Sequence, residues 1–251
     1  MRTAIISDIH ANLEALRVVL DHIDTQNVER IVCLGDVLGY GPNPVECVDL
    51  VAQRCEWCLM GNHDFGVLYE PTNFNHAAEQ AAYWTRAQFE KEADKEVAAR
   101  RWEFLGRLKV RVMYENFLCV HGSPRRPINE YLFPEDAINS PVKMQQIFER
   151  IEKFCMVGHT HVPGVFTDEP DFYPPGDVEG VYKFNNGEKI IINPGSVGQP
   201  RDLDPRSSYA ILNDDCVEFF RLEYDARTTA DKIKAIPELS DWLGERLIEG
   251  R

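Results

Sequence analysis

The chain has 251 residues, enough for one large domain with a substantial core, and we expect a single domain over residues 1–251. A hydrophobic content of 44% and a charged content of 27% are typical of globular proteins. The formal net charge of −14 disfavours extended nucleic-acid binding, although bound cations can reverse the field inside one pocket. No apolar run approaches the roughly 18 residues of a membrane span, and the N-terminus lacks a signal peptide's apolar region, so we expect a cytoplasmic protein.

The chain contains seven cysteines, an odd number that argues against a disulfide framework. Cys55 and Cys58 form a Cys-x-x-C pair that enters a predicted strand. A reactive pair of this kind begins a helix, whose dipole lowers the thiol pKa. We therefore interpret the thiols as reduced and buried, with a thiol redox protein as the disfavoured alternative.

Strands and helices alternate in the N-terminal part of the chain. Buried-strand patterns run over 3–7, 28–36 and 55–60, and Asn12 and Asn43 are the expected caps of the two intervening helices. This alternation indicates parallel strands in βαβ units. In such sheets the functional residues gather in the loops at the carboxyl ends of the strands.

The rest of the chain is predicted to be more antiparallel. We expect hairpins around Glu115–Asn116, around Asn186–Gly187 and within 209–222. The other expected elements are helices within 75–108, over 142–152 and after Asp225, a strand from 154, and a mobile acidic loop over 167–180. A mixed two-sheet sandwich flanked by helices would accommodate both halves.

Five short stretches share one pattern, an apolar strand that ends in Asp, Asn or His. They are IISDIH (5–10), VCLGD (32–36), CLMGNHD (58–64), LCVHG (118–122) and MVGHTH (156–161). Each alone is weak, because an Asp after a strand is usually a turn and a lone His usually packs. Five of the seven histidines, however, lie just beyond a predicted strand, so they would converge on one rim of a shared sheet.

This rim offers imidazoles, carboxylates and one amide, a donor set that suits Mn, Fe, Zn or Ni. The candidate metal ligands are Asp8, His10, Asp36, Asn62, His121, His159 and His161. One ion needs three or four ligands, so the set fits two divalent metal ions that share a carboxylate, for which Asp36 is the central candidate. Two ions about 3.5–4 Å apart can clamp a phosphoryl group and hold a hydroxide as the nucleophile.

In their order along the chain, the motifs D-x-H, G-D, G-N-H-D, a lone H and G-H-x-H resemble the calcineurin-like metallophosphoesterase superfamily. The stretch SDIHANLEAL resembles its small prokaryotic phosphoesterase branch in particular. The resemblance implies an α/β fold, a four-layer α/β/β/α sandwich of two mixed β-sheets flanked by helices. It implies one metal held by Asp8, His10, Asp36 and His161, and a second held by Asp36, Asn62, His121 and His159. It also implies that His63 donates to an oxygen of the substrate or leaving group, and that Asp64 orients His63.

The resemblance implies a phosphoesterase that hydrolyses a phosphodiester, a phosphomonoester or a phosphoric anhydride, with a small phosphorylated or nucleotide-type substrate. Candidate substrate contacts in polar loops are Asn62, His63, Arg125, Asn193, Ser196 and Arg201, with ordinary turn chemistry as the equal alternative for the last four. Tyr40 and Tyr131 are among the aromatic residues that could stack on a base. The alternative from another class is a catalytically inactive metal-binding scaffold with the same fold. The sequence leaves the substrate, the native metals and the oligomeric state open.

Overall fold

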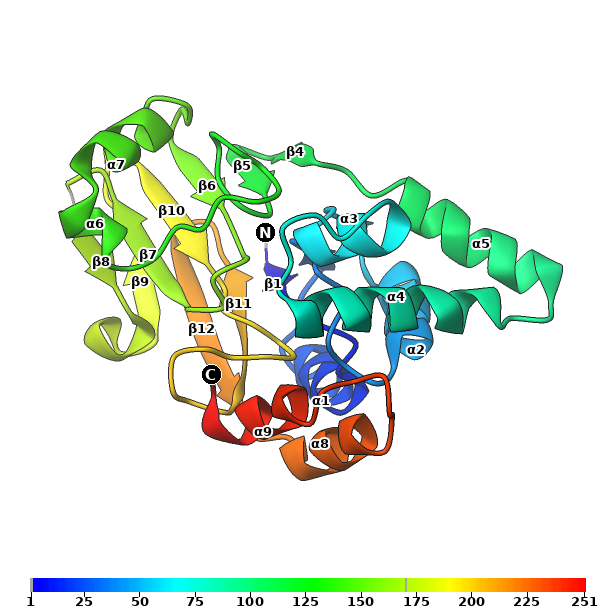
Figure 1. Cartoon of the computed structure of the whole chain (residues 1–251). Helices are drawn as coiled ribbons and strands as arrows, with labels where there is room; N and C mark the ends of the chain where they lie inside the picture. The colour runs from blue at the N-terminus through cyan, green and yellow to red at the C-terminus, as the bar shows by residue number, and fades with distance from the viewer. Residues whose placement is uncertain (1, 170) are drawn as a thin grey trace.

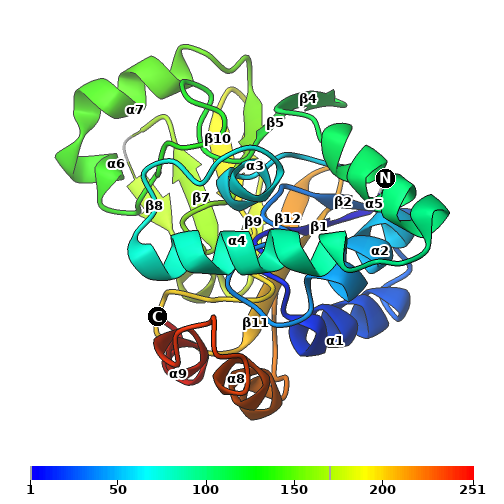
Figure 2. The same ribbon diagram turned by 45° about the vertical axis from the view of Figure 1, so that its right-hand side comes forward.

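The computed structural model describes residues 2–169 and 171–251, which build two six-stranded sheets (Figures 1 and 2). The first sheet has the order β3-β2-β1-β11-β12-β9 and the second β4-β5-β6-β10-β7-β8. The strands of the first sheet are β1 Thr3–Ile6, β2 Arg30–Cys33, β3 Trp57–Cys58, β9 Val181–Lys183, β11 Ser207–Leu212 and β12 Cys216–Leu222. Those of the second are β4 Arg111–Tyr114, β5 Phe117–Val120, β6 Phe154–Met156, β7 Gly164–Thr167, β8 Asp171–Tyr173 and β10 Ile190–Asn193.

Both sheets mix parallel and antiparallel pairs. In the first, β1, β2 and β3 are parallel, as the alternation of strands and helices predicts, and β11, β12 and β9 continue the sheet in antiparallel pairs. In the second, β5, β6 and β10 form the parallel centre, and β4, β7 and β8 add antiparallel edges. The carboxyl ends of β1, β2, β5 and β6 therefore carry the loops in which the candidate ligands lie.

Helices cover the outer faces of both sheets, as Figures 1 and 2 show. Near the first sheet lie α1 Leu13–Asp24, α2 Pro44–Arg54, α3 Asn62–Leu68, α4 His76–Glu90 and α5 Lys95–Gly106, and near the second lie α6 Asp136–Asn139 and α7 Pro141–Phe148. Asn12 caps α1 as predicted, since its side chain accepts from the Ala15 amide at 3.2 Å. The helix expected over 142–152 ends earlier, at Phe148.

The alternation of β1 divides the core into layers. Ala4 and Ile6 pack with α1 and α2, whereas Ile5 lies between the sheets, in one cluster with Met156 and Ile192. Ile191 points to the other side of the second sheet, in a cluster with residues of α7. Two sheets with helices on both outer faces give the expected four-layer α/β/β/α sandwich.

The prediction of a hairpin at Asn186–Gly187 is wrong. The strand before the turn, β9, pairs with β12 at the edge of the first sheet, whereas β10 lies between β6 and β7 in the second. All four residues of β10 are buried, so this strand belongs at the centre of a sheet that is covered on both faces. The turn connects the two sheets instead of pairing its neighbours.

The acidic stretch 167–180 contains more regular structure than the predicted loop. Its residues include β8, which pairs with β7, and a 3-10 turn over Pro175–Val178. The tail forms two helices, α8 Ala226–Lys234 and α9 Trp242–Glu249, instead of one. In both views α8 and α9 lie at one end of the molecule, where α8 contacts α1. No helix in the described part of the chain could cross a membrane.

Candidate metal centre

The loops after β1, β2, β5 and β6 bring the predicted ligands into one buried cluster. Asp8 and His10 follow β1, Asp36 follows β2, His121 follows β5, and His159 and His161 follow β6. Asn62 is the first residue of α3, with residues 59–61 between it and the end of the short strand β3. Each of these seven side chains is at most 8% exposed. The convergence predicted from the strand ends is therefore present in the structure.

Asp36 lies at the centre of the cluster. Its Oδ2 is 3.3 Å from Nε2 of His121 and 3.8 Å from Nε2 of His10. Around it, Asp8 Oδ1 lies 3.2 Å from His161 Nε2, and Asn62 Oδ1 lies 3.3 Å from His121 Nε2. Asp36 thus joins a group on the His10 side to a group on the His121 side.

Three sets of donor atoms in the cluster have the spacing that a cation needs. Within each set the ligand atoms lie within 4.8 Å of one another. The sets are Asp8 with His10 and His161, His10 with Asp36 and His63, and Asp36 with His121 and His159. Two of the three include Asp36, and the first and third share no residue.

Backbone carbonyls orient three of the imidazoles. Nδ1 of His10 lies 3.0 Å from the Leu38 oxygen, Nδ1 of His121 lies 2.9 Å from the Leu34 oxygen, and Nδ1 of His161 is hydrogen-bonded to the Gln199 oxygen. A neutral imidazole that donates from Nδ1 carries its lone pair on Nε2. All three Nε2 atoms take part in the short contacts of the cluster, which is the arrangement of metal-ligating histidines.

Nε2 of His159 is buried without a hydrogen-bond partner in the described residues, and Oδ2 of Asp36 is buried beside the imidazole nitrogens of His121 and His10, at 3.3 Å and 3.8 Å. A buried acceptor without a partner is costly, and native proteins rarely leave one. A divalent cation would satisfy both atoms. The donor set and these two atoms together fit a metal centre.

The backbone at the site adopts a conformation that non-glycine residues avoid. The φ angles are positive at Asp8 (53°), His10 (49°), Asp36 (53°), His159 (69°) and His161 (63°). Backbone hydrogen bonds between the loops hold two of these turns in place. The Asp8 amide donates to the Gly35 oxygen and the His10 amide donates to the Asp36 oxygen, each at 3.0 Å. Backbone strain of this kind persists where the surrounding structure over-determines it, and it clusters at functional sites.

The charges of the cluster depend on one another. Burial alone would raise the pKa of the Asp36 carboxyl, but His121 and His63 hold it well below its ordinary value. Burial alone would lower the pKa of His121, but Asp36 raises it to about 10. Burial lowers the pKa of His10 well below its usual range and that of His159 to about 3. Without a metal, the cluster therefore holds a proton on His121, between the two aspartates.

His63 lies beside the cluster in an aromatic pocket. Its ring centroid is 4.9 Å from that of His10, 4.3 Å from that of Tyr40 and 4.6 Å from that of Phe74. Nδ1 of His63 is buried without a partner in the described residues. Gly39 makes room for this ring, because a Cβ at Gly39 would lie 2.4 Å from His63 Nδ1.

Asp64 is expected to orient His63, and this role stays a prediction, because the hydrogen bonds that its carboxylate forms in the described residues are to backbone amides. Its carboxylate accepts from the amides of Asp36 at 2.8 Å, Leu38 at 3.0 Å and Gly61 at 3.0 Å. Asp64 is the third residue of α3, a position where a side chain reaches back to the helix start. The residue ties the start of α3 to the loop that presents Asp36.

Three of the predicted substrate contacts have structural roles. Asn193 donates to the Gly158 oxygen and to Thr160 Oγ1, and its own oxygen accepts from the Gly195 amide. Ser196 donates to the Asp8 oxygen at 2.7 Å and accepts from the Gln199 amide. Arg125 pairs with Glu130 and donates to Gln146. Their hydrogen-bonding groups are used within the protein, and their role as substrate contacts stays a prediction.

Arg201, by contrast, lies at the site. Burial lowers the pKa of His63 most and the charge of Arg201 lowers it next, against the opposing effect of Asp36. The Cζ of Arg201 is 6.0 Å from the Tyr40 ring centroid. The sequence reasoning missed Arg246, whose Cζ lies 5.8 Å from the same centroid. Arg246 lies on the C-terminal helix α9 and follows no strand, so the strand-end pattern could not reveal it.

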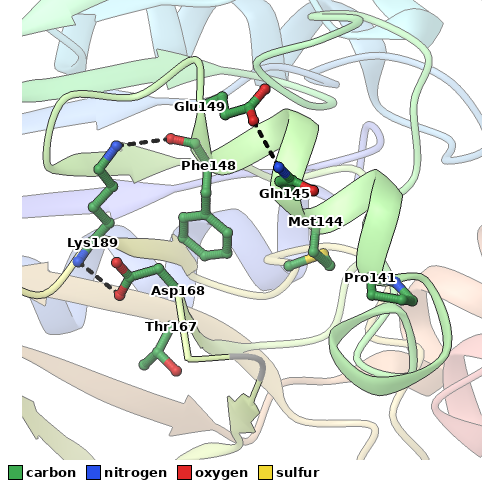
Figure 3. Close-up of a pocket in the computed structure, with 8 residues that line it drawn as sticks. All are labelled: Pro141, Met144, Gln145, Phe148, Glu149, Thr167, Asp168 and Lys189. Atoms are coloured by element: carbon green, nitrogen blue, oxygen red, sulfur yellow. Dashed lines mark hydrogen bonds between the residues drawn. The ribbon is translucent and has the colours of Figure 1, made fainter.

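The hollow drawn in Figure 3 lies elsewhere, between α7 and β7. It measures about 450 Å³ and is lined by Met144 and Phe148 of α7, together with Asp168 and Lys189. Its polar groups bind one another, since Lys189 Nζ donates to the Phe148 oxygen at 3.1 Å. None of the candidate ligands lines this hollow, and we do not assign the chemistry to it.

The fold and the site define a metallophosphoesterase, a hydrolase of phosphoric esters. The comparisons agree, because the sequence model of the calcineurin-like phosphoesterase superfamily domain matches residues 1–215, and the chain belongs to this superfamily. The chain is 38% identical to an uncharacterized protein of Methanocaldococcus jannaschii, over 99% of this chain and 98% of that protein. The crystal structure of a metallophosphoesterase from Sphaerobacter thermophilus is 38% identical, with a TM-score of 0.83 and full coverage of both chains. A hypothetical protein from Pyrococcus horikoshii shares the fold at 18% identity, with a TM-score of 0.76, over 100% of this chain and 98% of that one.

Proposed function

We propose that this metallophosphoesterase hydrolyses a phosphoric ester or anhydride at two divalent metal ions that share Asp36. The observation that supports two ions most directly is the place of Asp36, between the His10 side and the His121 side of the cluster. One ion would be held by Asp8, His10, Asp36 and His161, and the other by Asp36, Asn62, His121 and His159. Mn, Fe, Zn and Ni all suit this donor set.

Two such ions would supply a hydroxide nucleophile at neutral pH and would neutralise the charge of the phosphoryl group. The residues of the chain hold and orient this arrangement. The backbone carbonyls of Leu34, Leu38 and Gln199 fix the imidazole rings of three ligands. Because these ligands are buried and their loops are tied together, the site is organised before the substrate arrives.

We assign His63 to the substrate oxygens. Its Nδ1 has no partner in the described part of the chain, and its ring lies beside that of His10. An N–H of this imidazole would donate to an oxygen of the phosphate or of the leaving group. Asp64 acts as a positioning residue, through the amides of Asp36 and Leu38 rather than through the His63 ring.

The substrate proposal is a small phosphorylated or nucleotide-type molecule. The net charge of −14 opposes a long nucleic-acid backbone, whereas the cluster would be positive locally once two divalent ions are bound. We propose that residues 1–251 act as one domain, because the C-terminal helices pack with Tyr40, next to the site.

The test is hydrolysis of p-nitrophenyl phosphate and bis-p-nitrophenyl phosphate with Mn(II) added. We expect turnover of at least one ester by the wild type and a loss of about 100-fold or more in the variants Asp36→Asn and His63→Ala. Matched controls are Asp231→Asn on α8 and His76→Ala at the start of α4, which are exposed and outside the cluster. Full activity in His63→Ala would contradict the role of that residue.

The alternative, an inactive metal-binding scaffold, makes a different prediction. It expects two bound metals and no turnover over a broad panel of phosphoric esters. All seven predicted ligands lie in one buried cluster with His63 beside it, and this complete set supports the enzyme, because a scaffold without turnover does not require all of these residues.

A further inference from the structure

Two guanidinium groups lie near the ring of Tyr40. The Cζ atom of Arg201 is 6.0 Å and that of Arg246 is 5.8 Å from the Tyr40 ring centroid. The same ring centroid is 4.8 Å from that of His10 and 4.3 Å from that of His63. Both arginines and the candidate ligand His10 are therefore neighbours of the same Tyr40 ring.

Neither arginine is neutralised by an acidic side chain. Across residues 2–169 and 171–251, no Asp or Glu oxygen forms an ion pair with Arg201 or Arg246, although the chain contains 41 acidic residues. Several other arginines do have such a partner, as Arg101 has in Asp49 and Glu92. Arg246 donates one N–H to the main-chain oxygen of Arg251, and among the described residues no Asp or Glu side chain satisfies the rest of either guanidinium, so an anionic ligand would complete this arrangement in a protein of net charge −14.

Arg246 is held nearly buried while part of its guanidinium stays free. The residue is 9% exposed, its Cζ lies 4.5 Å from the Trp242 ring centroid, and its Nε donates to the backbone oxygen of Arg251. In the part of the chain that the structure describes, its two Nη groups have no hydrogen-bond acceptor. Burial, and next the charge of Arg201, lower the pKa of Arg246 to about 10, so the side chain stays charged at neutral pH.

Arg201 is fixed relative to the metal ligands. Its Nε and Nη2 donate to Oε1 of Gln199, at 3.3 Å and 2.7 Å, and the backbone oxygen of Gln199 accepts from His161. One residue thus positions both a ligand imidazole and a guanidinium. This rigidity keeps the ordering cost of ligand binding low.

We propose that Arg201, Arg246 and Tyr40 form an anion subsite that binds a second phosphate of the substrate, beside the phosphate that is hydrolysed. The planar guanidinium forks match the oxygens of a phosphate, and two of them favour a dianionic group. The subsite rests on the proposed function and narrows it to substrates that carry phosphate at two positions. Arg246 lies outside residues 1–215, which the superfamily model matches, so the C-terminal helices supply this selectivity.

Two nucleotide esters that share the same scissile bond and differ only in a second phosphate test the subsite. Thymidine 5′-(p-nitrophenyl phosphate) and its 3′-phosphorylated form both release p-nitrophenolate when water replaces the aryl oxygen on phosphorus. A nucleoside is a suitable carrier because Tyr131, which stacks on His159 at 3.8 Å, has a 38% exposed side chain at this rim. We expect kcat/KM of the wild type to be about 10- to 100-fold higher for the 3′-phosphorylated ester.

The ratio of the two kcat/KM values should fall to near one in Arg246→Gln and in Arg201→Gln, and Arg246→Lys should restore part of it. Arg227→Gln is the matched control, because it removes the same charge from an exposed position on the neighbouring helix α8. An unchanged ratio in Arg246→Gln, or equal values for the two esters in the wild type, would overturn the subsite.

A binding measurement separates failure of the subsite from failure of the proposed function. Calorimetry compares thymidine 3′,5′-bisphosphate with thymidine 5′-phosphate on the wild type and on Arg246→Gln. We expect the wild type to bind the bisphosphate about 10-fold more tightly or better, and the variant to lose this preference. If the wild type cleaves neither ester but keeps the binding preference, the function proposal fails and the subsite stands. Equal affinities for both nucleotides in the wild type would overturn the subsite even if both esters are cleaved.

Discussion

Replacing Asp64 with Asn tests how this residue supports the site. The carboxylate accepts hydrogen bonds from three buried backbone amides, those of Asp36 and Gly61 at Oδ2 and that of Leu38 at Oδ1. An Asn side chain keeps only one acceptor atom and places an N–H donor against at least one of these amides. Burial, and next the charge of Asp36, raise the pKa of Asp64 to about 7, so we count only the amide that is left without a partner, which costs about 1–3 kcal/mol. We therefore expect the free energy of unfolding to fall by about 1–3 kcal/mol, which corresponds to roughly 3–10 °C in Tm.

Urea unfolding of the metal-free protein measures this change in two backgrounds, the wild type and His63→Ala. If Asp64 holds the loops, Asp64→Asn destabilises both by the same amount within about 0.5 kcal/mol. Asp231→Asn, an exposed change on α8, serves as the control and should leave stability nearly unchanged. The reasoning is refuted if Asp64→Asn leaves stability intact, or if its effect disappears when His63 is absent.

Two further substitutions and one metal-binding measurement probe the neighbouring parts of the site. Gly39→Ala should lower kcat/KM by about 10-fold or more without loss of metal, because φ is +87° and the new methyl would displace His63; a fully active variant in steady-state assays would contradict this. Metal binding at pH 7 should release about one proton, because Asp36 raises the pKa of His121 to about 10, and the affinity for the metal should therefore fall as the pH falls. Calorimetric heats of metal binding that do not depend on the buffer would contradict this expectation. Asn193→Ala should reduce stability by about 2–3 kcal/mol and leave KM near the wild-type value, and a large rise in KM with normal stability would support Asn193 as a substrate contact.

The candidate ligands could be predicted because they depend on strand ends, which the sequence marks clearly. Asp8, Asp36 and His121 each follow an apolar strand, and the parallel part of a sheet brings such ends together. The partners of the ligands could not be predicted in the same way. The carbonyls of Leu34 and Leu38 are ordinary backbone groups, and only the path of the loop in space places them against an imidazole.

Local patterns misled where tertiary packing decided the outcome. Asn186–Gly187 is a strong hairpin signal, yet β10 is buried on both faces and pairs within the other sheet. The resemblance implied that Asp64 orients His63, but it did not reveal which groups the Asp64 carboxylate binds. Successive residues of a helix point in different directions, and Asp64 reaches back to the helix start.

The count and coupling of the bound metals test the central proposal, that Asp36 joins two ions. After reconstitution with Mn(II), elemental analysis should give two manganese ions per wild-type chain, and the electron paramagnetic resonance spectrum should show two coupled ions. In Asp36→Asn, which removes the shared carboxylate, the coupling should be lost and the metal content should fall. One ion per chain in the wild type, or two ions without magnetic coupling, would contradict the account.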